Sequence, residues 1–169
     1  TYSRGYKGPA YNVFFNMTAN NAAVIDEETA DSYELGFKST LFDSRMILNG
    51  AIFSATYDNF QANNFLFLNG TLITTLTNAG EVSTEGFELD FLALPIDNFT
   101  LSGGIAYTDA QVDKYFSPPG QTPQIESGTK LPLAPEWKAS VSAEYRFERD
   151  MVDIVPNLLY VYTDDQYAD

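Results

Sequence analysis

The sequence of 169 residues contains no cysteine and no histidine. Without cysteine it can form no disulfide, no thiolate metal site and no cysteine nucleophile. Without histidine it lacks the commonest general base and the commonest zinc ligand, which excludes serine–histidine–aspartate catalysis and histidine–metal chemistry from this chain. These absences argue against an enzyme, and we expect no cofactor and no bound metal.

Basic residues are also scarce: Lys and Arg total 9 against 23 Asp and Glu, which gives a net charge of -14. Such a chain cannot displace the counterions of a phosphate backbone, so nucleic acid is not an expected partner. A run of about 18 apolar residues, the minimum for a helical membrane span, is missing as well. The N-terminus carries no signal-peptide pattern, and Thr1 already opens what reads as a strand, so we expect an internal piece of a longer protein.

What the sequence does contain is alternation, most clearly from Trp137 to Phe147. Apolar and polar residues alternate along this stretch, which predicts a strand with one apolar and one polar face. Its length matches the roughly 9 to 11 residues of a tilted strand that crosses a bilayer. The apolar positions are Trp137, Ala139, Val141, Ala143, Tyr145 and Phe147, and the polar positions are Lys138, Ser140, Ser142, Glu144 and Arg146.

Other stretches repeat this pattern, so we predict an all-β, antiparallel fold. Tyr33–Leu41, Phe87–Ala93 and Leu101–Thr108 alternate in the same way, and no segment carries a sustained helical stripe. Residues 46–60 and 153–163 also have strand composition, but the sequence leaves the facing of both open. The predicted polar face carries Glu34, Lys38, Glu88, Asp90, Lys138, Glu144 and Arg146.

The connections between these strands alternate between short and long. The expected short turns are Phe42–Arg45, Leu94–Asn98 and Glu148–Asp150, with a hairpin turn at Asn69-Gly70, whereas Gly8–Ser32 and Phe116–Pro135 are long and polar. Short turns on one side and long loops on the other are typical of outer-membrane barrels with short periplasmic turns and long external loops.

A half-buried soluble sandwich would also alternate, so the membrane interpretation needs further support. The alternating stretches exceed the 5 to 6 residues or so of typical soluble strands. Aromatic residues also gather near strand ends, as membrane interfaces favour, and charged residues such as Lys38 and Glu144 occupy strand middles, which suits a wet lumen. The aromatic residues expected near the long loops are Tyr33, Tyr107 and Trp137, and those near the short turns are Phe42, Phe91, Tyr145 and Phe147.

Several stretches, taken in order, resemble the C-terminal barrel region of TonB-dependent outer-membrane receptors. They are Tyr2-Ser3-Arg4-Gly5-Tyr6-Lys7 with Pro9, Tyr33-Glu34-Leu35-Gly36-Phe37-Lys38, Tyr57-Asp58-Asn59-Phe60-Gln61, Asn78-Ala79-Gly80 with Thr84-Glu85-Gly86-Phe87-Glu88, and Leu131-Pro132-Leu133-Ala134-Pro135. The resemblance covers nearly the whole chain. It implies that residues 1–169 supply about seven or eight strands of a larger, about 22-stranded transmembrane β-barrel closed by a plug. The family's plug domain, its energy-coupling N-terminal segment and its final strand have no counterpart here.

The same resemblance implies a function and a set of partners. It implies an active-transport receptor in the Gram-negative outer membrane that takes up a scarce ligand, most simply a ferric siderophore, and that is energised by the TonB complex through the N-terminal region. Expected partners are outer-membrane lipid, the receptor's own plug domain, TonB and the small-molecule ligand. The alternatives left open are a secreted soluble β-sandwich that binds carbohydrate, TonB-dependent uptake of a carbohydrate or another non-iron nutrient, and a passive porin.

Candidate ligand-binding residues lie in the loop from Tyr6 to Phe15, where Tyr6, Tyr11, Phe14 and Phe15 form an aromatic group. Such rings can stack on a ligand, but packing of the loop on the barrel rim explains them equally well. Acidic pairs such as Glu88 with Asp90 invite a glycosidase hypothesis, yet polar wall positions explain them better. The glycines inside strands, which are Gly36, Gly86, Gly103 and Gly104, suggest barrel bends or contact with plug backbone rather than approach of a ligand.

The predicted facing of the strand at Trp137–Phe147 can be tested with one pair of variants. Val141→Arg would place a charge on the apolar face, at a cost of up to about 2 to 4 kcal/mol near the bilayer midplane, and should impair barrel assembly. Ser140→Arg would place the same charge on the polar face and should be tolerated. Heat-dependent gel mobility of the full-length protein reports assembly, and equal effects of both variants would contradict the assigned facing.

Overall fold

The computed structural model describes residues 1–11, 24–68, 71–116 and 125–166, with side chains except at 64–68 and 71–75. Every regular element in these ranges is a β-strand, so they include no helix that could span a membrane. The strands are β1 Tyr2–Lys7, β2 Ala10–Tyr11, β3 Val24–Ile25, β4 Glu28–Leu41, β5 Met46–Leu68, β6 Thr71–Ile96, β7 Phe99–Tyr115, β8 Thr129–Lys130, β9 Trp137–Tyr145 and β10 Asn157–Thr163.

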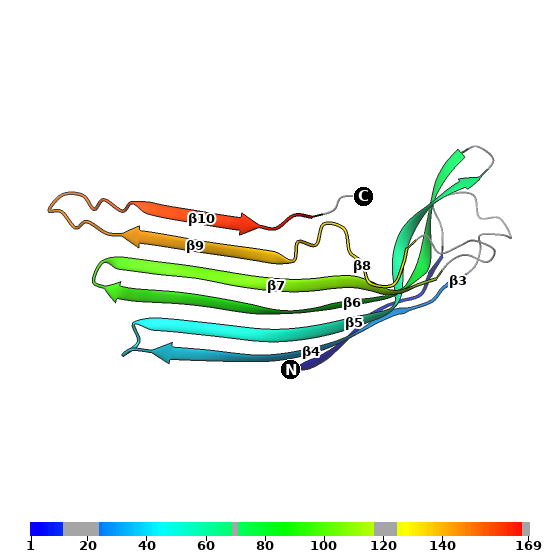
Figure 1. Ribbon diagram of the computed structural model, residues 1–169, viewed down its shortest axis with the longest axis horizontal. Helices are drawn as coiled ribbons and strands as arrows, with labels where there is room; N and C mark the ends of the chain where they lie inside the picture. Colours follow the sequence, from blue (N-terminus) through cyan, green and yellow to red (C-terminus); the bar gives the residue numbers. More distant parts are fainter. Residues whose placement is uncertain (12–23, 69–70, 117–124, 167–169) are drawn as a thin grey trace. The chain divides into compact units, whose positions relative to one another are not determined.

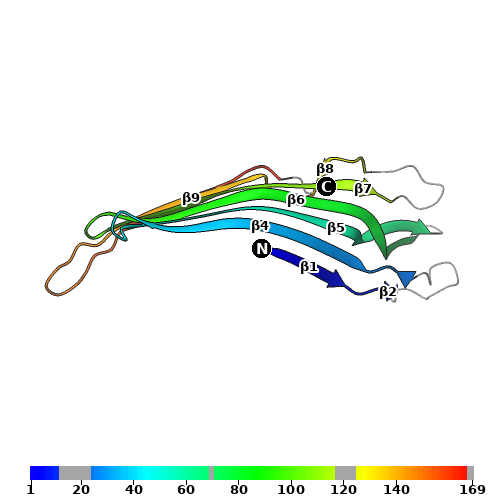
Figure 2. The same ribbon diagram turned by 90° about the horizontal axis from the view of Figure 1, so that it is seen from below.

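The strands form an antiparallel meander, in which neighbours along the chain are mostly neighbours in the sheet. The main sheet has eight strands among the described residues, in the order β1-β4-β5-β6-β7-β9-β10 with β8 paired to β7, while β2 and β3 pair separately (Figure 1). The pair β2–β3 lies between β1 and β4 in the sequence, and β1 runs alongside β4 (Figure 2). The all-β antiparallel prediction is therefore confirmed.

Two of the predicted short turns are short in the structure. At residues 42–45 the Arg45 N–H donates to the Phe42 carbonyl oxygen at 3.0 Å, and Phe42, Asp43 and Ser44 all have left-handed φ angles. At Asp97-Asn98 the turn uses a φ of 62° at Asn98. The predicted turn at Asn69-Gly70 lies outside the described residues; β5 ends at Leu68 and β6 begins at Thr71.

The connection after β9 is longer than the sequence pattern predicts. Strand β9 ends at Tyr145 and β10 begins only at Asn157, with one isolated bridge between Phe147 and Ile154. Pro156 has no N–H to donate to a ladder, which explains why the predicted strand does not run from Asp153 without interruption. Its carbonyl oxygen still accepts from the Tyr145 N–H at 3.2 Å.

The chain divides into two compact units, and the long strands contribute to both. Unit 1 comprises Thr1–Tyr33, Ala55–Thr84 and Ala110–Leu131, and unit 2 comprises Glu34–Ser54, Glu85–Asp109 and Pro132–Asp169. Five buried apolar side chains lie in unit 1, together with the buried polar residue Gln61; the apolar ones are Ile25, Ala55, Val82, Ala110 and Val112. Unit 1 therefore has a small core of its own.

Unit 2 instead exposes large apolar side chains on one face of its sheet. Leu35 is 71% exposed and Ile52 58%, and across β10 Leu158 reaches 73%. A sheet face of this kind in water would be a site of aggregation or association. The exposed aliphatic residues of unit 2 thus need an apolar partner, whereas the buried core of unit 1 does not.

The register of β7, β9 and β10 defines the two faces in unit 2. Gly103 pairs with Val141, which pairs with Tyr160, and these positions share the apolar face. Gly104 pairs with Ser140, which pairs with Val161 on the polar face. The facing of residues 157–163, which the sequence left open, is thereby assigned: Leu158, Tyr160 and Tyr162 lie on the apolar face.

Contacts between side chains assign the facing of β5 within unit 2. A Cβ placed on Gly50 would lie 2.6 Å from the Phe37 ring, so Gly50 and its alternate neighbour Ile52 share the apolar face. Asn49 donates to the Asp90 carboxylate at 2.9 Å on the opposite face. Ile47, Ala51 and Phe53 are separated from Asn49 by an even number of positions and therefore share its polar face, which is thus partly apolar in β5.

Glycines inside the strands mark places where neighbouring strands approach closely. At Gly36, Gly86, Gly103 and Gly104 the nearest atom to an added Cβ would be a backbone carbonyl oxygen of the adjacent strand. At Gly86 that atom is the Tyr107 oxygen, at only 2.0 Å. Gly80 adds a left-handed φ of 139° to a distance of 1.8 Å from the Lys114 oxygen. Strand-to-strand spacing within the wall explains these glycines.

We expect Gly86→Ala to impair barrel assembly because its methyl group cannot fit without separating β6 from β7. The cost should be at least the roughly 1 to 3 kcal/mol of an overpacked core position. Gly5→Ala is the matched control, since its nearest neighbour would be the Ala30 Cβ at an ordinary 3.5 Å. Heat-dependent gel mobility of the full-length protein should fall in Gly86→Ala alone, and normal assembly of that variant would contradict the spacing argument.

Candidate functional site

A groove crosses the polar face of unit 2 and is lined by four strands, β6, β7, β9 and β10. Its volume is about 330 Å³, and its floor includes Gly104 and Ala106 of β7. Glu88 and Asp90 line it from β6, and Lys138 lines it from β9. The register that pairs Ala106 with Lys138 places the small residues between the carboxylates and the ammonium group. The groove can therefore accept a polar group that carries both hydrogen-bond donors and acceptors.

The structure brings some of the predicted polar-face residues together and leaves others apart. Glu88, Asp90 and Lys138 share the groove, and Glu144 lies along the same face opposite Thr100. On β4, Glu34 and Lys38 alternate with the exposed Leu35 and Phe37 and so lie on the polar face.

Arg146 differs from the other predicted polar-face residues because it lies just beyond the end of β9. Its guanidinium group forms an ion pair with Asp153 at 3.4 Å in the connection to β10. Both side chains are about half exposed, so the pair contributes little stability, about 0 to 1 kcal/mol. Its position points to a role in the connection rather than in the strand.

The predicted aromatic group is described only in part. Tyr6 lies in β1 opposite Thr29 and is 68% exposed, and Tyr11 lies in β2 opposite Val24 and is 54% exposed. Phe14 and Phe15 lie outside the described residues. The two tyrosines present free ring surface in unit 1 that could stack on a planar or apolar ligand.

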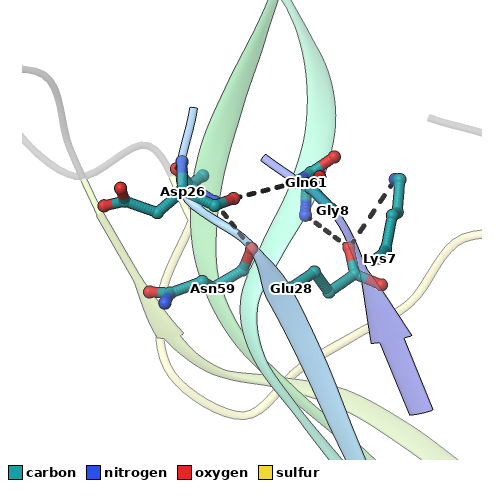
Figure 3. Close-up of polar contacts among 7 residues, drawn as sticks. Lys7, Gly8, Asp26, Glu28, Asn59 and Gln61 are labelled. Atoms are coloured by element: carbon teal, nitrogen blue, oxygen red, sulfur yellow. Dashed lines mark hydrogen bonds and ion pairs between the residues drawn. The ribbon is translucent and has the colours of Figure 1, made fainter. Parts of the chain in front are cut away.

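A polar junction in unit 1 was not predicted from the sequence (Figure 3). Its centre is Gln61 of β5, which is only 6% exposed. The Gln61 side-chain amide donates to the Gly8 carbonyl oxygen at 3.1 Å and to the Asp26 carbonyl oxygen at 2.9 Å. Its backbone N–H donates to the Glu28 carboxylate at 2.7 Å, and Lys7 lies 3.7 Å from the same carboxylate.

Asn78 of β6 completes this polar junction. Its side-chain oxygen accepts from the Asp26 N–H at 2.8 Å, and its amide nitrogen donates to the Asp26 oxygen at 3.0 Å. The same nitrogen donates to the Asn59 carbonyl oxygen at 2.9 Å. Asn59 has a left-handed φ of 54° within β5, which interrupts the regular strand geometry at that point.

A sequence signal for the polar junction existed but could not be interpreted alone. Asn59, Gln61 and Asn78 all stand in the stretches that carry the family resemblance. Amide side chains inside strands are unusual, because Asn is depleted in strands. Their partners are backbone groups far away in the sequence, and only the three-dimensional structure identifies them.

Among the described residues, no group of three or more acidic side chains is arranged to hold a metal ion. Comparison with known proteins adds the decisive observation. The family described as "TonB dependent receptor-like, beta-barrel" matches residues 1–169. The chain belongs to the TonB-dependent receptor family. Barrels of this family lie in the outer membrane of Gram-negative bacteria, and the family consists of transporters and receptors.

Individual TonB-dependent receptors also match this chain. A probable TonB-dependent siderophore receptor, PiuA of Acinetobacter baumannii, is 28% identical over 90% of this chain, and the metal-pseudopaline receptor CntO of Pseudomonas aeruginosa is 29% identical over 72%. The solved structure of PiuA matches with a TM-score of 0.64. The ferric yersiniabactin receptor FyuA of Yersinia pestis matches 99% of this chain with a TM-score of 0.74 at 20% identity, and therefore supports the fold.

The chain spans about a fifth of these TonB-dependent receptors. It covers 20% of the PiuA sequence and 23% of the FyuA chain. It therefore corresponds to a fragment of the family's barrel.

Proposed function

We propose that this chain is part of the wall of an outer-membrane receptor that takes up a ferric siderophore with energy relayed by TonB. The observation that carries the proposal is the match of the whole chain to the receptor-barrel family, combined with a sheet that has one apolar and one polar face in unit 2. The relatives are named as receptors for siderophores or for metal–pseudopaline, which supports a metal chelate over a carbohydrate. This role is transport and requires no catalytic residue.

Two aromatic groups in unit 2 support a position for the bilayer. Tyr107 and Trp137 have ring centroids 4.8 Å apart and lie with Phe87 at one end of the β7–β9 pair. At the other end Tyr145 lies between Phe99 and Phe147. Aromatic rings prefer the two membrane interfaces. The apolar face between the two groups would then contact lipid.

The distance between these aromatic groups fits a thin outer membrane. The stretch from Phe99 to Tyr107 covers roughly 27 Å along the strand at about 3.4 Å per residue, or roughly 20 Å along the membrane normal at a tilt of about 40°. The apolar band of outer-membrane barrels is about 25 Å tall.

The polar face would line the interior and contact the plug. Glu34, Lys38, Glu88, Asp90, Lys138 and Glu144 are assigned to this interior surface, with Arg146 at its turn end. The groove is open and carries Glu88, Asp90 and Lys138 among apolar neighbours, so that it offers charged contacts to another segment. The ligand would be captured by unit 1, where Tyr6 and Tyr11, with Phe14 and Phe15, supply stacking surface.

Uptake of labelled iron by a host strain tests this function. In cells that lack their own receptors, expression of the full-length protein should restore uptake of at least one chelate in a panel of ferric yersiniabactin, a ferric catecholate and iron–pseudopaline. Deletion of tonB should abolish that uptake. Removal of the full-length gene from its native host should slow growth in iron-depleted medium.

The controls separate this proposal from its alternatives. Uptake that persists without TonB would point to a passive porin. Recovery of growth on an oligosaccharide as sole carbon source, with no iron chelate transported, would contradict siderophore uptake and favour a carbohydrate receptor. A full-length protein that remains in the soluble fraction would contradict the membrane assignment.

A further inference from the structure

The polar junction ties together two backbone positions that lie far apart in the sequence. The Gln61 side-chain nitrogen donates one hydrogen to the Gly8 carbonyl oxygen and the other to the Asp26 carbonyl oxygen. Gly8 and Asp26 stand on either side of residues 9–25. A single nitrogen atom in β5 therefore binds the chain just before β2 and just after β3, and Figure 3 shows the three residues converging.

The Asn78 side chain binds Asp26 with the paired hydrogen bonds that a neighbouring strand would make. Asn78 accepts from the Asp26 N–H and donates to the Asp26 carbonyl oxygen, so both backbone groups of Asp26 are satisfied by one side chain. The remaining Asn78 hydrogen goes to the Asn59 oxygen, on the strand that also carries Gln61. Side chains of β5 and β6 thus both bind Asp26.

The chemistry of the junction requires neutral amides. Gln61 and Asn78 each use both N–H groups of the side chain to satisfy carbonyl oxygens. A carboxylate in either place has no donor to offer and would face those oxygens with a negative charge. At residue 61 the charge would also lie near Glu28, whose carboxylate accepts from the Gln61 N–H and whose side chain is only 14% exposed.

We propose that Gln61 and Asn78 are positioning residues for ligand capture: by binding Gly8 and Asp26 they hold the β2–β3 pair in one geometry relative to β5 and β6. This inference rests on the proposed function, because β2 carries Tyr11 and the adjoining β1 carries Tyr6. The two residues touch no ligand themselves. Their amides set where the β2–β3 pair begins and ends, and hence where Tyr11 is presented.

Hydrogen exchange in the full-length receptor tests the positioning directly. Gln61→Glu and Asn78→Asp are isosteric, remove the side-chain donors and add a negative charge, so exchange in peptides that cover residues 24–28 should accelerate about tenfold or more, the factor equal to about 1.4 kcal/mol. Asn157→Asp is the matched control, because Asn157 donates a single exposed bond to Ser142 at 3.1 Å in unit 2. If Gln61→Glu does not assemble, Gln61→Met removes the same donors without adding a charge.

Transport kinetics separate positioning from general damage. With whichever chelate of the panel is transported, Gln61→Glu and Asn78→Asp should raise the half-saturating concentration about tenfold and leave the maximal rate and the heat-dependent gel mobility unchanged. Asn157→Asp should change neither kinetic constant. A loss of maximal rate with unchanged half-saturation would overturn the positioning role.

The two proposals fail in different ways. If no chelate in the panel is transported by the unmodified receptor, the proposed function fails, and exchange alone decides the positioning role. Faster exchange in residues 24–28 of the Gln61 and Asn78 variants, with the control unchanged, would support it. Equal exchange in all variants and the control would overturn it even if the receptor transports a ferric siderophore.

Discussion

Inside a bilayer no water is present to satisfy a backbone N–H or C=O group, so a chain that crosses it with strands must satisfy these groups between neighbouring strands. The meander from β4 through β10 does this with short hairpins on one side, at residues 42–45 and 97–98. The close approaches at Gly86 and Gly103 follow from the same constraint, since a side chain there would separate the strands whose backbones must pair. Pairing also fixes the register, and the register fixes which side chains share a face of the sheet.

The register explains why the sequence predicted some faces and not others. In β4, β6, β7 and β9 the apolar face falls on odd-numbered residues, but in β5 and β10 it falls on even-numbered ones, as Gly50 beside Phe37 and Tyr160 opposite Val141 establish. Whether the parity changes across a hairpin depends on the number of residues in its turn. Alternation reveals a strand, but its phase relative to the next strand needs the turn geometry. Because apolar residues such as Phe53 and Val161 lie on the polar face, the sequences of β5 and β10 alone do not show which residues face which side.

One part of the candidate site could likewise be predicted from the sequence and another part could not. The sequence was enough to place Glu88, Asp90 and Lys138 on a polar face, because each belongs to a strand with clear alternation, and the structure brings them into one groove. It was not enough to find the polar junction. Gln61 and Asn78 bind backbone atoms of Gly8 and Asp26. Every residue has a backbone carbonyl, so the residue type does not show which carbonyl accepts a hydrogen bond. The same argument covers Arg146, whose place beyond β9 depends on where Pro156 interrupts pairing with β10.

The junction also differs from the ion pairs of the chain. Ion pairs in the described part include those of Arg4, Lys7, Arg45, Lys114 and Arg146, and each of these basic side chains is at least half exposed. Pairs of this kind weaken as salt screens them. The amide bonds of Gln61 and Asn78 carry no net charge, and Gln61 is almost fully buried, so their strength depends little on ionic strength. The contacts at Gly8 and Asp26, on either side of the β2–β3 pair, should therefore hold over a wider range of salt than the ion pairs of the chain.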